Sequence, residues 1–127
     1  MVSKHKPIRE IDDPIFLSYL SGLIDGEGCF SITKDKCGRK AFRIRVVLEE
    51  KDSGVLDFIS KKIGGHRYHR KTQKSWKSHW HEQEEWHVSV KSDSLKLSIM
   101  IEPYLFVKKK VCNDFITEIK NYRPKTQ

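Results

Sequence analysis

The strongest constraint on the fold of this chain is the alternating stretch at residues 41–49. Its apolar residues recur with a period of two: Phe42, Ile44, Val46, Leu48. Arg43 and Arg45 occupy positions between them, together with Val47. Because successive side chains of a β-strand point to opposite faces, the stretch predicts a strand with one apolar and one basic face. Helices can then cover the apolar face and leave the basic face open.

A helix and a first strand are predicted before this stretch. Asp13 followed by Pro14 is typical of a helix start, because Asp caps free amides and Pro fits the first turn. Apolar residues at intervals of three and four predict a helix over residues 13–25. Residues 29–36 alternate as a half-buried strand does, and residues 37–40 form the turn of a hairpin.

The same kinds of pattern predict a second helix, a second hairpin and two further helices. The helix covers residues 52–63, the strands lie near residues 66–71 and 85–90, and the last helices cover residues 92–101 and 104–122. The element order is therefore α-β-β-α-β-β-α-α. It predicts an α+β fold with an antiparallel sheet on one side and helices on the other.

The length of 127 residues leaves room for one domain. We expect that domain at residues 13–122, between a basic N-terminal tail at 1–12 and a C-terminal tail at 123–127. A chain this short buries a limited fraction of its surface and gains from oligomerisation.

The charge of the chain favours a polyanionic partner. It contains 25 Lys and Arg residues against 17 Asp and Glu residues, a formal net charge of +8, and nucleic acid fits this better than an anionic membrane. No stretch has the length of a membrane span, and the charged N-terminus does not resemble a signal peptide. We expect an intracellular protein, in a chloroplast, a mitochondrion or a microbial cytoplasm.

The cysteines and histidines do not predict a zinc site. The three cysteines contain no C-x-x-C pair: Cys29, Cys37, Cys112. The spacings of His66 with His69 and of His79 with His81 would suit a metal. These histidines lack nearby Cys and lie in a Lys- and Arg-rich stretch, so we expect them at the surface or facing DNA.

The segment from Leu20 to Gly28 reads LSGLIDGEG, and it resembles the motif LAGLIDADG that names a family of homing endonucleases. Six of its nine positions are identical, and the departures at Ser21, Gly26 and Glu27 preserve small size or the acidic group. Later landmarks of the family are also resembled, at residues 50–52, 102–105 and 108, so that the resemblance extends over residues 14–122.

This resemblance implies a site-specific endonuclease, encoded in an intron or intein, that cleaves double-stranded DNA. It further implies a saddle-shaped sheet over the major groove and a homodimer with a long, near-palindromic site. The residues agree with this. Ser18, Gly22 and Gly26 lie one turn apart and leave one side of the helix without bulk, so that a second copy can approach closely. The two Glu27 carboxylates would then lie near each other and bind Mg²⁺ or Mn²⁺ between them.

The site residues follow from the resemblance and from strand parity. Glu27 matches the metal ligand of the family, with the carbonyl of Gly26 as co-ligand. Lys108 matches a basic catalytic residue that assists the scissile phosphate, and Glu50 falls at a catalytic position near the active site where the family often has Gln. The dimer interface is expected to include the following helix residues: Ser18, Ser21, Gly22, Asp25. The expected groove-reading residues are Ser31, Thr33, Arg43, Arg45, Arg67, His69, Lys71, His87 and Ser89.

Two alternatives stay open. The same scaffold would suit a maturase that binds intron RNA, because the basic face alone does not distinguish duplex DNA from structured RNA. A DNA-binding relative without cleavage activity is the other alternative, and the presence of Glu27 and Lys108 argues against it. Taken singly, small helix residues also fit packing within one core, and basic strand residues also fit a solvated surface.

Overall fold

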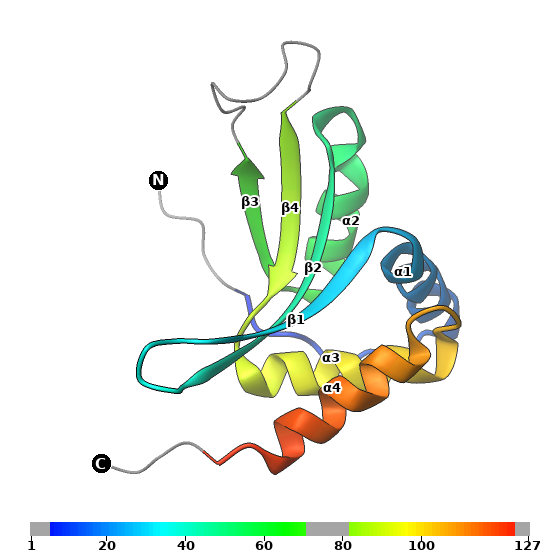
Figure 1. Ribbon diagram of the computed structural model, residues 1–127. Helices are drawn as coiled ribbons and strands as arrows, with labels where there is room; N and C mark the ends of the chain where they lie inside the picture. The colour runs from blue at the N-terminus through cyan, green and yellow to red at the C-terminus, as the bar shows by residue number, and fades with distance from the viewer. Residues whose placement is uncertain (1–5, 71–81, 124–127) are drawn as a thin grey trace.

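The chain folds into helices and strands in the predicted order, which confirms the α+β fold class (Figure 1). The computed structural model describes residues 6–70 and 82–123. The main elements are α1 (Pro14–Glu27), β1 (Gly28–Lys34), β2 (Lys40–Glu49), α2 (Ser53–Ile63), β3 (His66–Arg70), β4 (Gln83–Val88), α3 (Lys91–Ile101) and α4 (Lys109–Asn121). Two 3-10 turns, Glu50–Asp52 and Glu102–Tyr104, precede α2 and follow α3. None of these helices combines the length and the apolar character that a bilayer span needs.

The start of the last helix differs most from the prediction, since α4 begins at Lys109 and not at residue 104. The carboxylate of Asp25 accepts hydrogen bonds from the backbone amides of Phe106 (2.8 Å) and Lys108 (2.9 Å). These bonds hold the segment against the end of α1. Regular α-helical hydrogen bonding therefore begins only after the segment.

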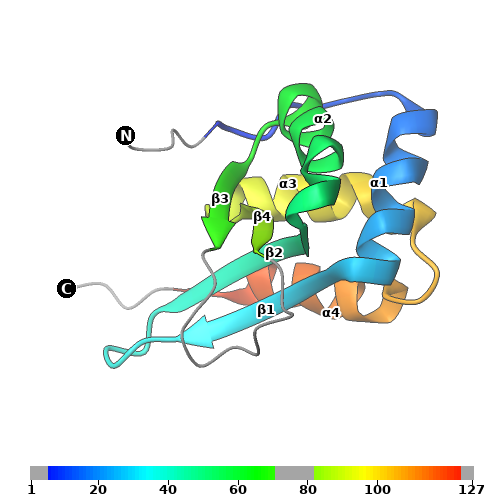
Figure 2. The ribbon, with the colours of Figure 1, turned by 90° about the horizontal axis from the view of Figure 1, so that it is seen from above.

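The four strands form one antiparallel sheet in the order β1-β2-β4-β3. The helices pack against one face of it: α1 and α3 contact β2, α2 contacts β4 and β3, and α4 contacts β1 (Figures 1 and 2). In the described part of the chain, no helix covers the opposite face. The sheet is thus one-sided, as the alternation in the sequence predicted.

The two faces of β2 are those that the sequence predicted. Phe42, Ile44 and Val46 are fully buried against the helices, whereas Arg43 is exposed. Ile44 is paired with Phe30 of β1 on one side and with Val88 of β4 on the other. Since paired residues share a face, the apolar side chains of three strands form one continuous layer of the core.

Trp86 anchors the second hairpin to the end of α2. Its side chain is fully buried, and its Nε1 donates a hydrogen bond to the carbonyl of Gly64 at 2.8 Å. Gly65 has a φ of 95°, and a Cβ atom there would lie 2.4 Å from Trp86 Nε1. Only glycine meets both conditions, so Gly65 fixes the close approach of β3 and β4 at this point.

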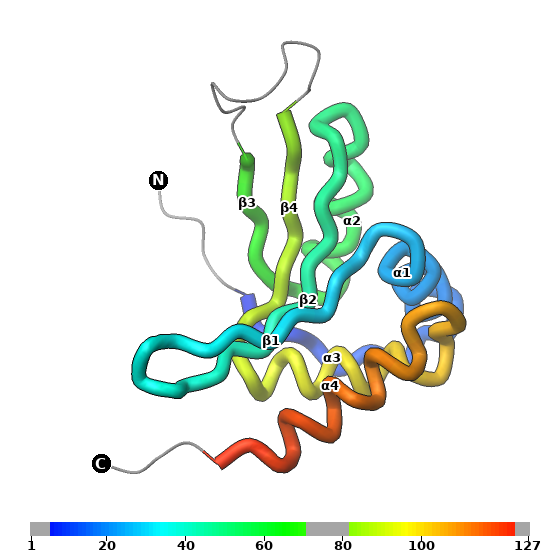
Figure 3. The backbone as a smooth tube through the Cα atoms, in the orientation of Figure 1, coloured from blue at the N-terminus to red at the C-terminus, as the bar shows by residue number. Residues whose placement is uncertain are grey.

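The segment before α1 is part of the fold from Lys6 onward, although the sequence suggested a tail (Figure 3). Lys6 pairs with Gly65 through two backbone hydrogen bonds, and the amide of Arg9 donates to the carbonyl of Ile63 at 2.9 Å. Ile8 is only 2% exposed and belongs to the core. A stretch of few apolar residues can thus be ordered by backbone pairing and a single buried side chain.

The junction between α1 and β1 leaves no room for a side chain. The amide of Gly28 donates to the carbonyl of Ile24 and caps the helix. A Cβ atom on Gly28 would lie 2.8 Å from the Cα, Cγ2 and carbonyl oxygen atoms of Ile24. The first strand therefore leaves the helix at a distance that only glycine permits.

Gly28→Ala should lower the free energy of unfolding by about 1–3 kcal/mol, because the added methyl group overpacks the junction. The matched control is Gly54→Ala in α2, where nothing lies within 4 Å of the new Cβ atom. The control should be neutral or up to about 1 kcal/mol more stable, since alanine favours a helix. Urea unfolding at one protein concentration measures both. Equal shifts in the two variants would contradict this account of the junction.

Candidate functional site

The open face of the sheet carries a mixed basic and polar set of side chains. The register pairs Ser31 with Arg43 and Arg45 with His87, so these residues share the face opposite the core. Arg43 is exposed and forms no ion pair with any residue of the described ranges. Thr33, two residues after Ser31 and therefore on the same face, is also exposed. Ser89 follows the end of β4 and is half-buried.

One carboxylate lies within this face and organises the cations around it. Glu85 is 6% exposed, and its Oε2 lies 2.7 Å from Nδ1 of His87. Burial alone would raise the pKa of Glu85, but the hydrogen bond and charge of His87, with the charges of Arg45 and Arg70, lower it below its ordinary value. Glu85 therefore stays ionised and reduces the net positive charge at the centre of the face.

The prediction of which β3 side chains lie on the open face was wrong, because the alternation is shifted by one residue. Arg67 is paired with Trp86 and His69 with Glu84, so both side chains lie on the helix side of the sheet. The reason is that β3 reads HRYHR and contains no alternating apolar residues that would fix its parity. The residues of β3 on the open face are His66, Tyr68 and Arg70. Lys71, also predicted to read the groove, lies outside the described residues.

The exposed side of α1 contains small residues, as predicted for a contact with a second copy. Ser18, Gly22 and Gly26 are exposed, and a Cβ atom on either glycine would meet nothing within 4 Å. Ser21 does not belong to this side. It is fully buried, and its hydroxyl donates to the carbonyl of Ile101 at 3.2 Å, so the prediction of Ser21 as an interface residue was wrong.

Asp25, also predicted at the interface, instead binds within its own chain. Its carboxylate accepts the two hydrogen bonds from backbone amides described above. Its backbone carbonyl accepts a third, from Nζ of Lys108 at 2.6 Å. Burial would raise the pKa of Asp25, but the amides of Phe106, Lys108 and Val107 outweigh burial and lower it. Asp25 thereby holds the ammonium group of Lys108 at the end of α1 where Glu27 lies.

Glu27 lies in a hollow of about 330 Å³ at the end of α1. The other residues that line the hollow come mainly from the end of β2 and the turn after it: Val47, Leu48, Glu49, Lys51, Asp52, Gln83. Within the described ranges, no hydrogen bond or ion pair engages the Glu27 carboxylate. Three carboxylates, those of Glu27, Glu49 and Asp52, thus share one solvent-open hollow and could bind a hard cation.

Glu50, predicted as a catalytic residue, does not line this hollow. Its carboxylate lies on the other side of the sheet beside His69 and Glu82. Its neighbour Glu49 occupies the hollow with Glu27. The position of Glu49 could have been predicted from the sequence, because Glu49 continues the alternation that places Arg43, Arg45 and Val47 on the open face.

The comparisons with known proteins agree with this arrangement. The sequence model of the family described as LAGLIDADG endonuclease matches residues 20–117. The homing endonuclease I-CvuI, solved in complex with DNA in the presence of Mg, is 18% identical, with a TM-score of 0.66 over 84% of this chain and 67% of its own. No curated protein is a significant match.

Two further solved structures have the same fold. The group I intron-encoded homing endonuclease I-CeuI, complexed with DNA, is 19% identical, with a TM-score of 0.66 over 89% of this chain and 58% of its own. The meganuclease I-AabMI, bound to uncleaved DNA, is 24% identical, with a TM-score of 0.60 over 83% of this chain and 37% of its own. This chain therefore spans about a third to two thirds of the length of these structures.

Asp25→Asn should lower the free energy of unfolding by about 1–3 kcal/mol at pH 7, because one of the two acceptor oxygens becomes a donor facing an amide. Because the pKa of Asp25 is lowered in the folded state, its carboxylate stabilises the fold fully above the pKa of the unfolded chain, which is about 4. This stabilisation is lost as the pH falls through the lower pKa of the folded state. The deficit of the variant should therefore shrink between about pH 5 and pH 2. Urea unfolding across that range measures it, and a deficit that is independent of pH would contradict the assigned role.

Proposed function

Since this chain belongs to the LAGLIDADG endonuclease family, we propose that it is a homodimeric, metal-dependent homing endonuclease that cleaves both strands of a long, near-palindromic DNA site. The observation that carries the proposal is the position of Glu27. Its carboxylate, which has no hydrogen-bond or ion-pair partner among the described residues, lies in an acidic hollow at the end of α1, at the same helix end as the ammonium group of Lys108.

The open face of the sheet supports DNA as the substrate. Its exposed Arg43 and the pair Arg45 and His87 present cations and hydrogen-bond donors on a helix-free surface. A two-stranded or larger β-surface fits the major groove of B-form DNA, where Arg reads guanine through two hydrogen bonds. The net charge of +8 adds attraction that does not depend on sequence.

The exposed side of α1 supports a dimer. Gly22 and Gly26 leave space for a second backbone, and the large apolar side chains of Ile15 and Tyr19 are 84% and 48% exposed on the same helix. Pairing two copies through α1 would cover this apolar surface. It would also bring two Glu27 carboxylates together, one for each DNA strand, and a two-fold axis in the protein requires a near-palindromic site.

The acidic hollow fits Mg²⁺ or Mn²⁺, because such ions prefer carboxylate oxygens together with phosphate oxygens and water. Glu27 would be the principal ligand, Glu49 and Asp52 line the same hollow, and the Gly26 carbonyl is a predicted co-ligand. A bound divalent ion lowers the pKa of water and stabilises negative charge on a phosphate in the transition state. Lys108 would add a fixed positive charge for the scissile phosphate.

Arg43→Ala should weaken binding to the preferred duplex by about 1–3 kcal/mol if the side chain reads a base edge. If it contacts a phosphate instead, the slope of the logarithm of the binding constant against the logarithm of salt concentration should become shallower by about one. Lys120→Ala in the last turn of α4 is the matched control, because it removes one exposed charge from a helix that packs against the covered face of the sheet. Filter binding at several salt concentrations measures both variants. Equal effects would mean that the open face does not bind DNA.

Glu27→Gln should abolish cleavage while DNA binding survives or tightens, because the amide keeps the shape of the side chain but cannot supply the charge that holds the ion. The proposed substrate is recovered from a random-sequence duplex library by collecting cleaved molecules in Mg²⁺. Binding of the parent and the variant to that duplex is then compared in Ca²⁺, and cleavage in Mg²⁺. A variant that cleaves at the parental rate would refute the assignment of Glu27 as the metal ligand.

A further inference from the structure

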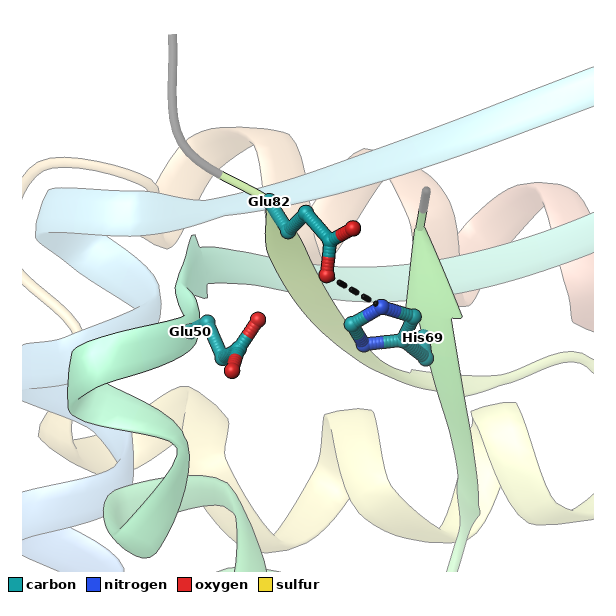
Figure 4. Close-up of side chains that lie close together, drawn as sticks. All are labelled: Glu50, His69 and Glu82. Carbon is teal, nitrogen blue, oxygen red and sulfur yellow. Dashed lines mark hydrogen bonds and ion pairs between the residues drawn. The ribbon is translucent and has the colours of Figure 1, made fainter. Parts of the chain in front are cut away.

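Three side chains that the proposed endonuclease site does not use come together at the end of the second hairpin where β3 stops and β4 starts (Figure 4). Glu50 begins the 3-10 turn after β2, His69 belongs to β3, and Glu82 directly precedes β4. The backbone amide of Glu50 donates to the carbonyl of Glu82 at 2.9 Å, so the two acidic residues are joined by the main chain. One ligand atom from each residue lies within 4.8 Å of the other two.

The His69 ring is held in the orientation that metal-binding histidines adopt. Its Nδ1 is hydrogen-bonded to the carboxylate of Glu84, and its Nε2 faces Glu82 at 2.8 Å. A carboxylate on the second ring nitrogen is the usual outer partner of a metal-bound histidine, because it fixes the tautomer and raises the basicity of the ring. Glu84 thus lies outside the three candidate ligands and orients one of them.

Glu84 is itself fixed in place. Its Oε1 accepts a hydrogen bond from Nη2 of Arg67 at 2.7 Å, and Nη1 of the same guanidinium is bound to Asp57 of α2. The Glu84 side chain is only 14% exposed. The orientation of the His69 ring is therefore set by a chain of contacts that extends from β4 to α2.

We propose that Glu50, His69 and Glu82 form a zinc site, which goes beyond the proposed endonuclease function and lies on the opposite side of the sheet from the hollow of Glu27. One imidazole nitrogen and two carboxylates are a ligand set for Zn²⁺, whereas Mg²⁺ favours oxygen ligands alone. Bonds of about 2.0–2.2 Å place ligand atoms about 3–4 Å apart, so the exposed Glu50 side chain closes the remaining distance by rotation. Water completes the coordination.

The ion would connect three segments that are distant in sequence. Glu50 leads into α2, and His69 and Glu82 lie where β3 ends and β4 begins. A zinc ion at this point would hold the two strands of the hairpin to the start of α2. It would thereby stiffen the part of the open face that β3 and β4 form. Its effect is on stability, and binding should raise the melting temperature of the protein.

A metal-free alternative uses the same contacts. The hydrogen bond to Glu84, with the charges of Glu84 and Glu82, raises the pKa of His69 above its ordinary value. A protonated His69 ring could then form ion pairs with Glu82 and Glu84 and offset part of their negative charge without any metal ion. The two explanations differ in the response of the protein to zinc.

The test is calorimetric titration of the chelator-treated full chain with ZnCl₂, in the absence of DNA and at neutral pH. The parent should bind zinc at a site, distinct from the hollow of Glu27, that is lost in His69→Ala and weakened at least about tenfold in Glu82→Gln and in Glu84→Gln. His66→Ala removes a histidine from the same strand but the opposite face, and it should keep the parental affinity. Glu27→Gln should also keep it, which separates this site from the proposed active site.

A second readout identifies the ligand directly. In nitrogen-15 spectra of the histidine rings, zinc should shift Nε2 of His69 and leave the ring of His66 unchanged. The proposal is overturned if His69→Ala binds zinc as tightly as the parent. It is also overturned if excess MgCl₂ competes as effectively as zinc, or if the parent binds no zinc and the metal-free alternative holds. Circular dichroism of each variant checks its fold, and Glu84→Gln retains all three ligands if His69→Ala does not fold.

Discussion

The close contact between the last turn of α1 and the residues that follow it determines where the functional groups of this chain lie. Gly28 lets β1 leave the helix against Ile24, and so places Glu27 at the rim of the sheet. On the other side of the same helix end, Asp25 binds the backbone before α4 and holds Lys108. Both contacts are short, and the first leaves no room for a side chain at Gly28. The carboxylate and the ammonium group are therefore positioned by the main chain and not by flexible loops.

The one-sided sheet explains how a small chain can provide both a core and a binding surface. The helices cover the apolar residues of β1, β2 and β4, and within the described residues the opposite face is left to polar and basic side chains. Glu85 within that face is kept ionised by its neighbours, so the face has a pattern of charge and not a uniform positive field. Patterned donors and acceptors suit the recognition of particular base edges.

The sequence predicted the parts of the fold where apolar spacing is strong. The alternation in β2 predicted both faces, because four apolar residues mark one of them. Alternation could not predict the faces of β3, because Tyr68 is its only apolar residue and lies on the open face. Arg67 and His69 were therefore assigned to the wrong side. Ser21 was assigned to an interface because it is small, yet its position on α1 faces Ile101 in the same chain. The cluster of Glu50, His69 and Glu82 could not be predicted, since it depends on the register of β3 with β4.

The central claim is that two copies of this chain carry two Glu27 carboxylates to the two strands of one DNA duplex. The most direct test is to incubate the protein with a random-sequence duplex library in Mg²⁺ and to sequence both new ends of every cleaved molecule. A dimer with two Glu27 carboxylates should make one cut in each strand, at positions related by the two-fold axis of a near-palindromic consensus. Cuts confined to one strand, or a consensus without two-fold symmetry, would contradict it.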